Sequence, residues 1–129
     1  MADISIVDRY FTALCSANGD LASSLFAEHG VLDDYRGGHR VGPGVIREFI
    51  NARPPRTLRM LGEVLVDGQR LTAYTLMDYA DGRSKTVRFI FTTDGRKIEH
   101  LCNSDIEFVP EEFLSRSTEL PSYPRAAGH

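Results

Sequence analysis

The sequence predicts an α+β fold in which helices come first and a strongly curved, mainly antiparallel sheet follows. Three Asp-Gly pairs, at 67–68, 81–82 and 94–95, divide the second half of the chain. Asp-Gly tolerates the positive φ angles of tight hairpin turns, so each pair is expected to join two adjacent antiparallel strands. The first half has helical periodicity instead, and helices segregated from an antiparallel sheet are typical of the α+β class.

The strands expected on either side of the three turns cover residues 57–66, 71–79, 85–92 and 97–109. Together they predict a four-stranded antiparallel meander. Three helices packed on a strongly bent sheet of this kind would form a cone with one open end. A cone built from about 110 residues has room for a ligand among its inner side chains.

Three helices are expected before the meander. The first has apolar residues at three- and four-residue spacing, with Asp3 as its cap. These apolar residues are Ile4, Ile6, Val7, Tyr10, Phe11 and Leu14. After a break at Asn18-Gly19, a second helix is expected to start at its cap Asp20 and to end at Gly30. Its inward residues would be Leu21, Leu25 and Phe26.

A short strand at 31–34 and a turn at Gly37-Gly38 are expected next, and then a third helix with Pro43 in its first turn. Its inner face would carry Val45, Ile46, Phe49 and Ile50. The tail, 110–129, has one possible helical turn at 111–115 and otherwise resembles a loose end. The sequence therefore predicts one domain spanning 1–129, with its core at about 4–109.

The composition is that of an ordinary globular domain, with 129 residues, 42% hydrophobic and 26% charged. A net charge of -3 argues against nucleic acid or an anionic membrane surface as a partner. The N-terminus lacks the features of a signal peptide, so we expect a cytoplasmic protein. Cys15 and Cys102 are expected to be reduced packing residues. No histidine pair has metal-ligand spacing, and we expect neither a metal nor another cofactor.

Several short motifs follow one another along the chain. They are Arg9-Tyr10-x-x-Ala13-Leu14, Gly19-Asp20-Leu21, Leu25-Phe26-Ala27, Asp34 followed by Gly37, Gly44-x-Ile46-Arg47-Glu48-Phe49, and finally the stretch 94–100. In this order they resemble the nuclear transport factor 2-like superfamily, and most closely its ketosteroid isomerase-like and SnoaL-like members, over about residues 4–109. The resemblance implies a cystatin-like cone with an internal pocket. This fold carries isomerases, dehydratases, cyclases, epoxide hydrolases and binding modules alike.

The resemblance also implies roles for particular residues. Tyr10 matches the tyrosine that donates to the oxyanion in the isomerases, and Asp34 matches their aspartate general base. Val87 stands where the isomerases have a second, protonated acid, so half of that oxyanion hole is absent. Arg88 falls on the opposite face of its strand, which argues against the epoxide-hydrolase arrangement of an arginine between two carboxylates.

Strand alternation gives independent support for an inward-facing Asp34. If Leu32 faces inward, Asp34 does too and Asp33 faces outward. Among apolar walls this carboxylate would have a raised pKa and suit proton transfer near neutral pH. The alternative is that both aspartates only start the turn that follows. For the hydroxyl of Tyr10, the alternatives are a substrate oxygen or a backbone carbonyl.

His100 is the third candidate for chemistry. Alternation places it on one face of its strand together with Ile98, Cys102 and Ser104, a set that suits the inside of the cone. A histidine across a pocket from an aspartate is an acid/base pair, although a core or interface histidine is the alternative. Other pocket residues expected to contact the ligand are Leu14, Phe26, Phe49, Val87, Phe89 and Cys102.

Two functions remain open on the sequence alone. One is an enzyme that removes a proton next to a carbonyl of a small hydrophobic molecule, as an isomerase, dehydratase or cyclase. The other is a non-catalytic module that binds a small ligand or serves dimerisation. In either case we expect a homodimer through the outer face of the sheet, because Tyr74 and Leu76, or their neighbours Thr75 and Met77, must lie outside.

Overall fold

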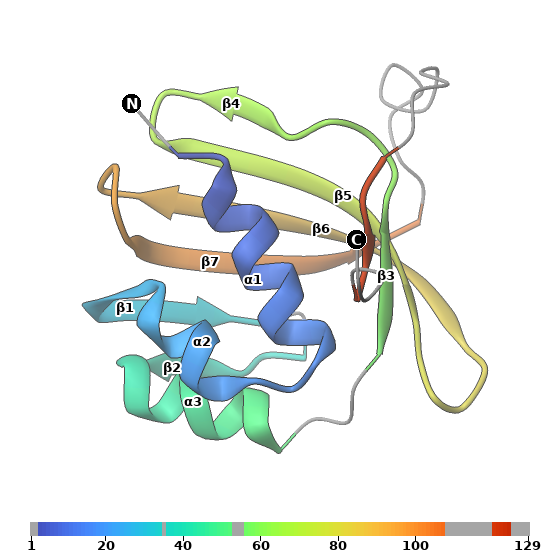
Figure 1. The fold of residues 1–129 in the computed structure, drawn as a ribbon, viewed down its shortest axis with the longest axis horizontal. Coiled ribbons are helices and arrows are strands. Elements are labelled where there is room, and N and C mark those ends of the chain that lie inside the picture. Colours follow the sequence, from blue (N-terminus) through green and yellow to red (C-terminus); the bar gives the residue numbers. More distant parts are fainter. Residues whose placement is uncertain (1–2, 35, 53–55, 108–119, 125–129) are drawn as a thin grey trace.

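Helices cover the concave face of a curved sheet in this computed structural model, which describes residues 3–34, 36–52, 56–107 and 120–124. Figure 1 shows α1, Ser5–Cys15, lying across the inside of the sheet, with α2, Gly19–Ser24, and α3, Pro43–Asn51, near one end of it. The mixed α+β class with a large curved sheet is therefore confirmed. The strand expected between the second and third helices is present, but it starts earlier, at Phe26, and forms a hairpin with a second strand at His39–Val41.

The sheet contains eight strands within the described residues, in the order β2-β1-β7-β6-β5-β3-β8, with β4 paired to β5. All pairs are antiparallel except β1 with β7, which is parallel. The strands are β1 Phe26–Asp33, β2 His39–Val41, β3 Thr57–Met60, β4 Leu65–Asp67, β5 Arg70–Asp78, β6 Ser84–Thr93, β7 Ile98–Ile106 and β8 Ser122–Tyr123.

The Asp-Gly pairs join strands as predicted, at β4–β5, β5–β6 and β6–β7. Gly68, Gly82 and Gly95 have φ angles of 62°, 89° and 97°, the left-handed region that glycine adopts without a steric penalty. The predicted strand 57–66 is in fact two strands, β3 and β4, with an interruption at 61–64. Both strands pair with β5, so the interruption divides one long edge into two short strands along the same partner.

The prediction that the second helix runs from Asp20 to Gly30 is wrong. The side chain of Asn18, rather than Asp20, caps α2 by accepting from the Leu21 N–H at 3.1 Å. The helix ends at Ser24, and Phe26 already pairs with Ile98 of β7. Pairing with a distant strand thus overrides the local helical pattern, as tertiary contacts commonly do.

The loose end expected for the tail is not what the structure shows at residues 120–124. Ser122 and Tyr123 form β8 and pair with β3, and Tyr123 is buried. Its hydroxyl donates to Asp8 Oδ1 at 2.6 Å, and its ring lies 5.5 Å from that of Phe11. The helical turn expected at 111–115 lies outside the described residues.

A bulge in β7 decides which side chains enter the cone. Thr92 pairs with His100, but the next residue of β6, Thr93, pairs with Ile98, so Glu99 is an extra residue. An extra residue in one strand reverses the alternation beyond it. Ile98 and Leu101, three positions apart, are therefore both fully buried.

The core of the cone is an aromatic cluster. Phe89 and Phe91 of β6 stack on each other at 6.3 Å between ring centroids. Tyr10 and Phe11 of α1 meet them in edge-to-face contacts, the shortest being Phe11 to Phe89 at 4.9 Å. Such pairs stabilise beyond the area they bury, by about 0.5–1.5 kcal/mol each. The first helix is thereby held against the sheet, and this places Tyr10.

Candidate functional site

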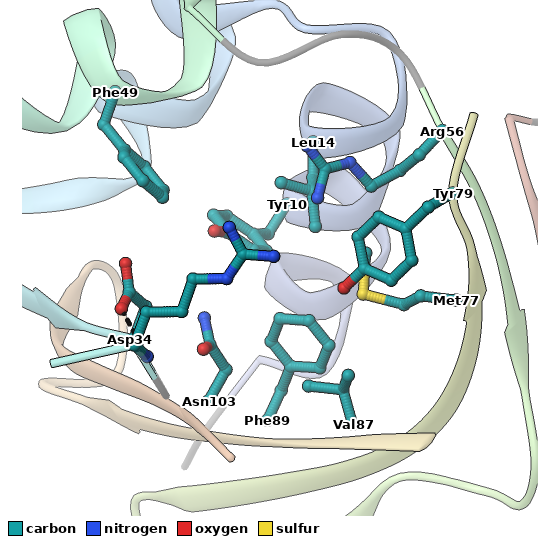
Figure 2. A pocket seen from close by; sticks show the side chains of 11 residues that line it. Tyr10, Leu14, Asp34, Phe49, Arg56, Met77, Tyr79, Val87, Phe89 and Asn103 are labelled. Carbon is teal, nitrogen blue, oxygen red and sulfur yellow. Dashed lines mark hydrogen bonds between the residues drawn. The ribbon is translucent and has the colours of Figure 1, made fainter. Parts of the chain in front are cut away.

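A pocket of about 40 Å³ lies inside the cone, bounded by α1, α3, the β1–β2 turn and the inner face of β5–β7. Figure 2 shows its side chains converging from these separate elements. Apolar walls with a few converging polar groups are characteristic of small-molecule sites. The lining residues are Tyr10, Leu14, Asp34, Arg36, Phe49, Arg56, Met77, Tyr79, Val87, Phe89 and Asn103.

Asp34 lies at the edge of this pocket with all its oxygens engaged. Its Oδ1 accepts from the backbone N–H of Arg36 at 2.8 Å and of Gly38 at 3.0 Å. Its Oδ2 accepts from Nη1 of Arg40 at 2.8 Å, and only 7% of the side chain is exposed. The guanidinium of Arg40 in turn lies over the ring of Phe49, 3.7 Å from its centroid.

The expectation of a raised pKa for Asp34 is wrong. Burial alone does raise the pKa of this carboxyl, as the apolar walls suggested. The N–H groups of Gly38 and Arg36, followed by the Arg40 guanidinium, together outweigh burial and bring the pKa below its ordinary value. Asp34 is therefore an ionised carboxylate at neutral pH, with its charge offset by Arg40.

Two glycines let the turn form around this carboxylate. Gly37 has a φ of 85°, which favours glycine. A Cβ on Gly38 would collide with Nη1 of Arg40 and Oδ2 of Asp34, so only glycine lets the ion pair pass so close to the backbone. The turn thus supports the alternative given above for Asp34, that it organises the loop. The same turn also places Asp34 at the pocket.

Tyr10 enters the pocket from α1. Its residue is 1% exposed, and its ring contacts those of Phe26 and Phe91 at 6.2 and 5.6 Å. Figure 2 shows its hydroxyl end directed into the pocket rather than toward the bulk of the core. Tyr10 and Asp34, predicted from separate segments, thus border the same cavity. Their roles in chemistry remain predictions.

The prediction that His100 and Cys102 face the inside of the cone is wrong. The bulge at Glu99 turns Leu101 and Asn103 inward, which sends His100 and Cys102 to the outer face. There, His100 Nε2 lies 2.8 Å from Oδ2 of Asp33. His100 therefore cannot exchange a proton with a molecule held beside Asp34.

Asp33 and its partners form a separate polar cluster on the outer face. Its Oδ1 lies 2.5 Å from Nδ1 of His39, so the carboxylate lies between two imidazoles. Hydrogen bonds from His100 and then His39 lower the pKa of Asp33, against a smaller opposing effect of burial. Asp33, the last residue of β1, and Asp34, which follows it, thus lie on opposite faces of the sheet.

Four of the expected ligand contacts, Leu14, Phe49, Val87 and Phe89, do line the pocket. Phe26 does not; it packs behind Tyr10. The sequence analysis missed five lining residues. Strand parity could have found Tyr79, which follows the inward residues Thr75 and Met77 of β5. Asn103 was hidden by the bulge, and the loop residues Arg36 and Arg56 have no periodicity to reveal them.

A second, larger groove of about 720 Å³ lies away from this site, between the start of α1 and the connection from β3 to β4. Its polar lining is acidic, with Asp3, Asp8 and Glu63, and Asp8 already accepts from Tyr123. Among its described lining residues, the hydroxyl groups are those of Ser5 and Tyr123, and the Tyr123 hydroxyl already donates to Asp8. We therefore place the candidate site inside the cone.

Within the described ranges, no three His, Cys, Asp or Glu side chains are grouped so as to hold a metal ion. In the same part of the chain, every helix is too short or too polar to cross a membrane.

Comparison with solved structures identifies the fold. A protein from Sphaerobacter thermophilus is 24% identical, with 84% of this chain and 99% of that chain matched at a TM-score of 0.74. A protein with a ketosteroid isomerase-like fold from Catenulispora acidiphila, in complex with trimethylamine, is 14% identical, with 84% and 87% matched at 0.69. An LEH-like epoxide hydrolase from M. tuberculosis is 13% identical, with 80% and 81% matched at 0.67.

Other similar structures are nuclear transport factor 2-like proteins and a cystatin-fold protein. The chain thus has the nuclear transport factor 2-like fold that its motifs indicated. Comparison with protein families and with curated proteins found no match. Sequence identities below 25% show a shared fold only, so the function has to be inferred from the chemistry of the site.

Proposed function

We propose that the chain binds a small, partly apolar molecule inside the cone, in the manner of a ketosteroid isomerase-like or SnoaL-like protein. One observation carries this proposal: Tyr10, Tyr79 and Asn103, from three different elements, border one cavity whose other walls are largely apolar. Hydroxyl and amide groups there can orient a ligand oxygen, while the apolar walls bind its carbon skeleton.

A pair of bulky substitutions on neighbouring residues tests where the ligand lies. Val87 is buried and lines the pocket, whereas Thr86 precedes it on β6 and faces the opposite side of the sheet. Val87→Phe should fill the cavity and abolish binding of small cyclic ketones in ligand-detected NMR, while Thr86→Phe should retain it. Binding that survives Val87→Phe in a folded protein would place the ligand elsewhere and overturn the proposal.

A second candidate is catalysis, with Asp34 as the base that removes a proton next to a carbonyl and Tyr10 as the donor to the resulting oxyanion. The supporting observation is that both side chains border the same cavity. The lowered pKa of Asp34 weakens it as a base, since proton transfer is most effective when the pKa of the base is near the working pH. Asp34 would therefore suit an already acidic C–H, or a dehydration or cyclisation in which a leaving group contributes.

Solvent deuterium exchange separates these two candidates. Small cyclic ketones and hydroxyketones would be incubated in D₂O with the wild type, Asp34→Asn and Tyr10→Phe. A catalytic site predicts a loss of roughly 10²–10⁴-fold in exchange rate for Asp34→Asn and roughly 10²-fold or more for Tyr10→Phe. Wild-type exchange no faster than the buffer rate, for compounds that bind, would favour a binding module.

A further inference from the structure

The charged residues that line the pocket are mostly basic. Among the described lining residues the one carboxylate is Asp34, and it is already paired with Arg40. Arg36 and Arg56 line the same pocket and carry guanidinium groups that remain charged at all relevant pH values. Among the described lining residues, guanidinium groups therefore outnumber carboxylates next to the apolar walls.

Arg56 is the residue that shows this excess most clearly. It precedes β3, and its Cζ lies 5.4 Å from the centroid of the Tyr79 ring. Figure 2 shows its side chain reaching from beside Tyr79 toward Leu14 at the pocket. Its positive charge acts inside the cone, because it lowers the pKa of the buried Cys15 thiol, although burial raises that pKa by more.

The Nε atom of Arg56 is buried and has no hydrogen-bond partner, and no described carboxylate forms an ion pair with this side chain. A buried donor without a hydrogen-bond partner is destabilising, and the charge of this partly buried side chain also lacks a counter-ion among the described residues. Guanidinium groups bind carboxylates through parallel N–H···O bonds, which would satisfy both deficits at once. Arg56 is thus arranged for an anionic oxygen group that the described residues do not supply.

The other lining residues complement such a group. Tyr79 and Asn103 offer polar groups, while Leu14, Met77 and Phe89 offer apolar contact. The cavity of about 40 Å³ admits only a small molecule. A ligand with a carboxylate at one end and a short apolar body would satisfy both kinds of wall.

We propose that the ligand of the cone is a small monocarboxylic acid, bound as its anion through Arg56. This inference rests on the proposed function, because it specifies the class of molecule that the cavity binds. It also narrows the catalytic candidate: the carbonyl whose neighbouring proton would be removed belongs to a molecule that also carries this carboxylate.

The test uses matched pairs that differ only in charge: acetate to octanoate and benzoate, each beside its primary amide. Affinities would be measured by NMR titration of the ¹⁵N-labelled protein, following residues 10, 79 and 103. We expect at least one carboxylate to bind about tenfold or more tightly than its amide. Arg56→Gln should remove that preference, so that each carboxylate binds no more tightly than its amide, and Arg56→Lys should retain part of it.

Arg59→Gln is the matched control, because Arg59 is exposed on β3 and its replacement changes the net charge equally. It should keep the preference for the carboxylate. Equal binding of acid and amide to the wild type, or an unchanged preference in folded Arg56→Gln, overturns this inference alone. Binding of neither member of any pair in the cone overturns the proposed function together with it.

Discussion

Asp33 and Asp34 are neighbours in the chain, yet they lie in two different electrostatic environments. Asp34 faces the cone, is almost fully buried and is held by two backbone N–H groups and a guanidinium. Asp33 faces outward, has a third of its side chain exposed and lies between two imidazoles. Both carboxyls have lowered pKa values, but the inner one relies on permanent charge and dipoles, and the outer one on partners that are charged only when protonated. The difference shows that one step along a strand can separate a site from a surface.

The two cysteines extend this comparison and should show its largest effect. Burial raises the pKa of Cys15 to about 11, whereas Cys102 is partly exposed on the outer face. At pH 8 roughly one Cys15 in a thousand would be thiolate, the reactive form. Because Cys15 is both buried and almost wholly protonated, we expect the more exposed Cys102 to react with a disulfide reagent at least about a hundredfold faster. Cys15→Ala and Cys102→Ala assign the two phases, and simultaneous modification in the folded protein would contradict the burial of Cys15.

Removing each aspartate should give unequal losses of stability. Asp34→Ala leaves Arg40 without its counter-ion and two turn N–H groups without an acceptor, which should cost about 3 kcal/mol of unfolding free energy. Asp33→Ala should cost less than about 1 kcal/mol, because its ion pairs are partly exposed and screened. Urea denaturation measures both, and 0.5 M salt should reduce only the smaller loss. Equal losses would refute the assignment of faces.

The dependence of stability on pH in the acid range should test the contribution of Asp34. Because its pKa is lowered on folding, its contribution is present above the unfolded pKa of about 4 and is lost as pH falls through the folded value. The difference in unfolding free energy between the wild type and Asp34→Asn should be constant above about pH 5 and shrink below about pH 4. Asp67→Asn, at an exposed carboxylate in the β4–β5 turn, should show a much smaller difference. If the difference in unfolding free energy grew toward low pH, the pKa of Asp34 would be raised on folding, which would contradict this prediction.

The smallest effect is expected for a substitution on the outer face of the sheet, where it should change the association of two copies of the chain. Tyr74 and Leu76 alternate with the buried Thr75 and Met77, so both lie on that face and are partly exposed. We propose that this face joins two copies of the chain, and that Leu76→Glu weakens their association about tenfold. Sedimentation velocity measures the dimer. Val45→Glu is the matched control, because Val45, expected on the inner face of α3, is in fact 50% exposed. A wild type that is monomeric at micromolar concentration would remove the proposal.

The sequence by itself determined the features that depend only on residues close together in the chain. The hairpin turns at Gly68, Gly82 and Gly95 follow from the steric freedom of glycine. The buried stripe of α1 follows from helical spacing, except that Ile4, expected in the stripe, is exposed and precedes the helix. The inward face of Asp34 followed from its separation of two residues from the buried Leu32. These features need no knowledge of what packs against them.

Only the tertiary structure decided the contents of the pocket and its charge. One extra residue, Glu99, reversed the alternation of β7 and exchanged His100 for Asn103, because strand parity holds only while the ladder is unbroken. The pKa of Asp34 depends on Arg40 across the hairpin and on N–H groups that the folded turn aims at it. Arg56 joins the pocket from a loop. Such contacts join residues that have no fixed spacing in the chain, and so no pattern in the sequence records them.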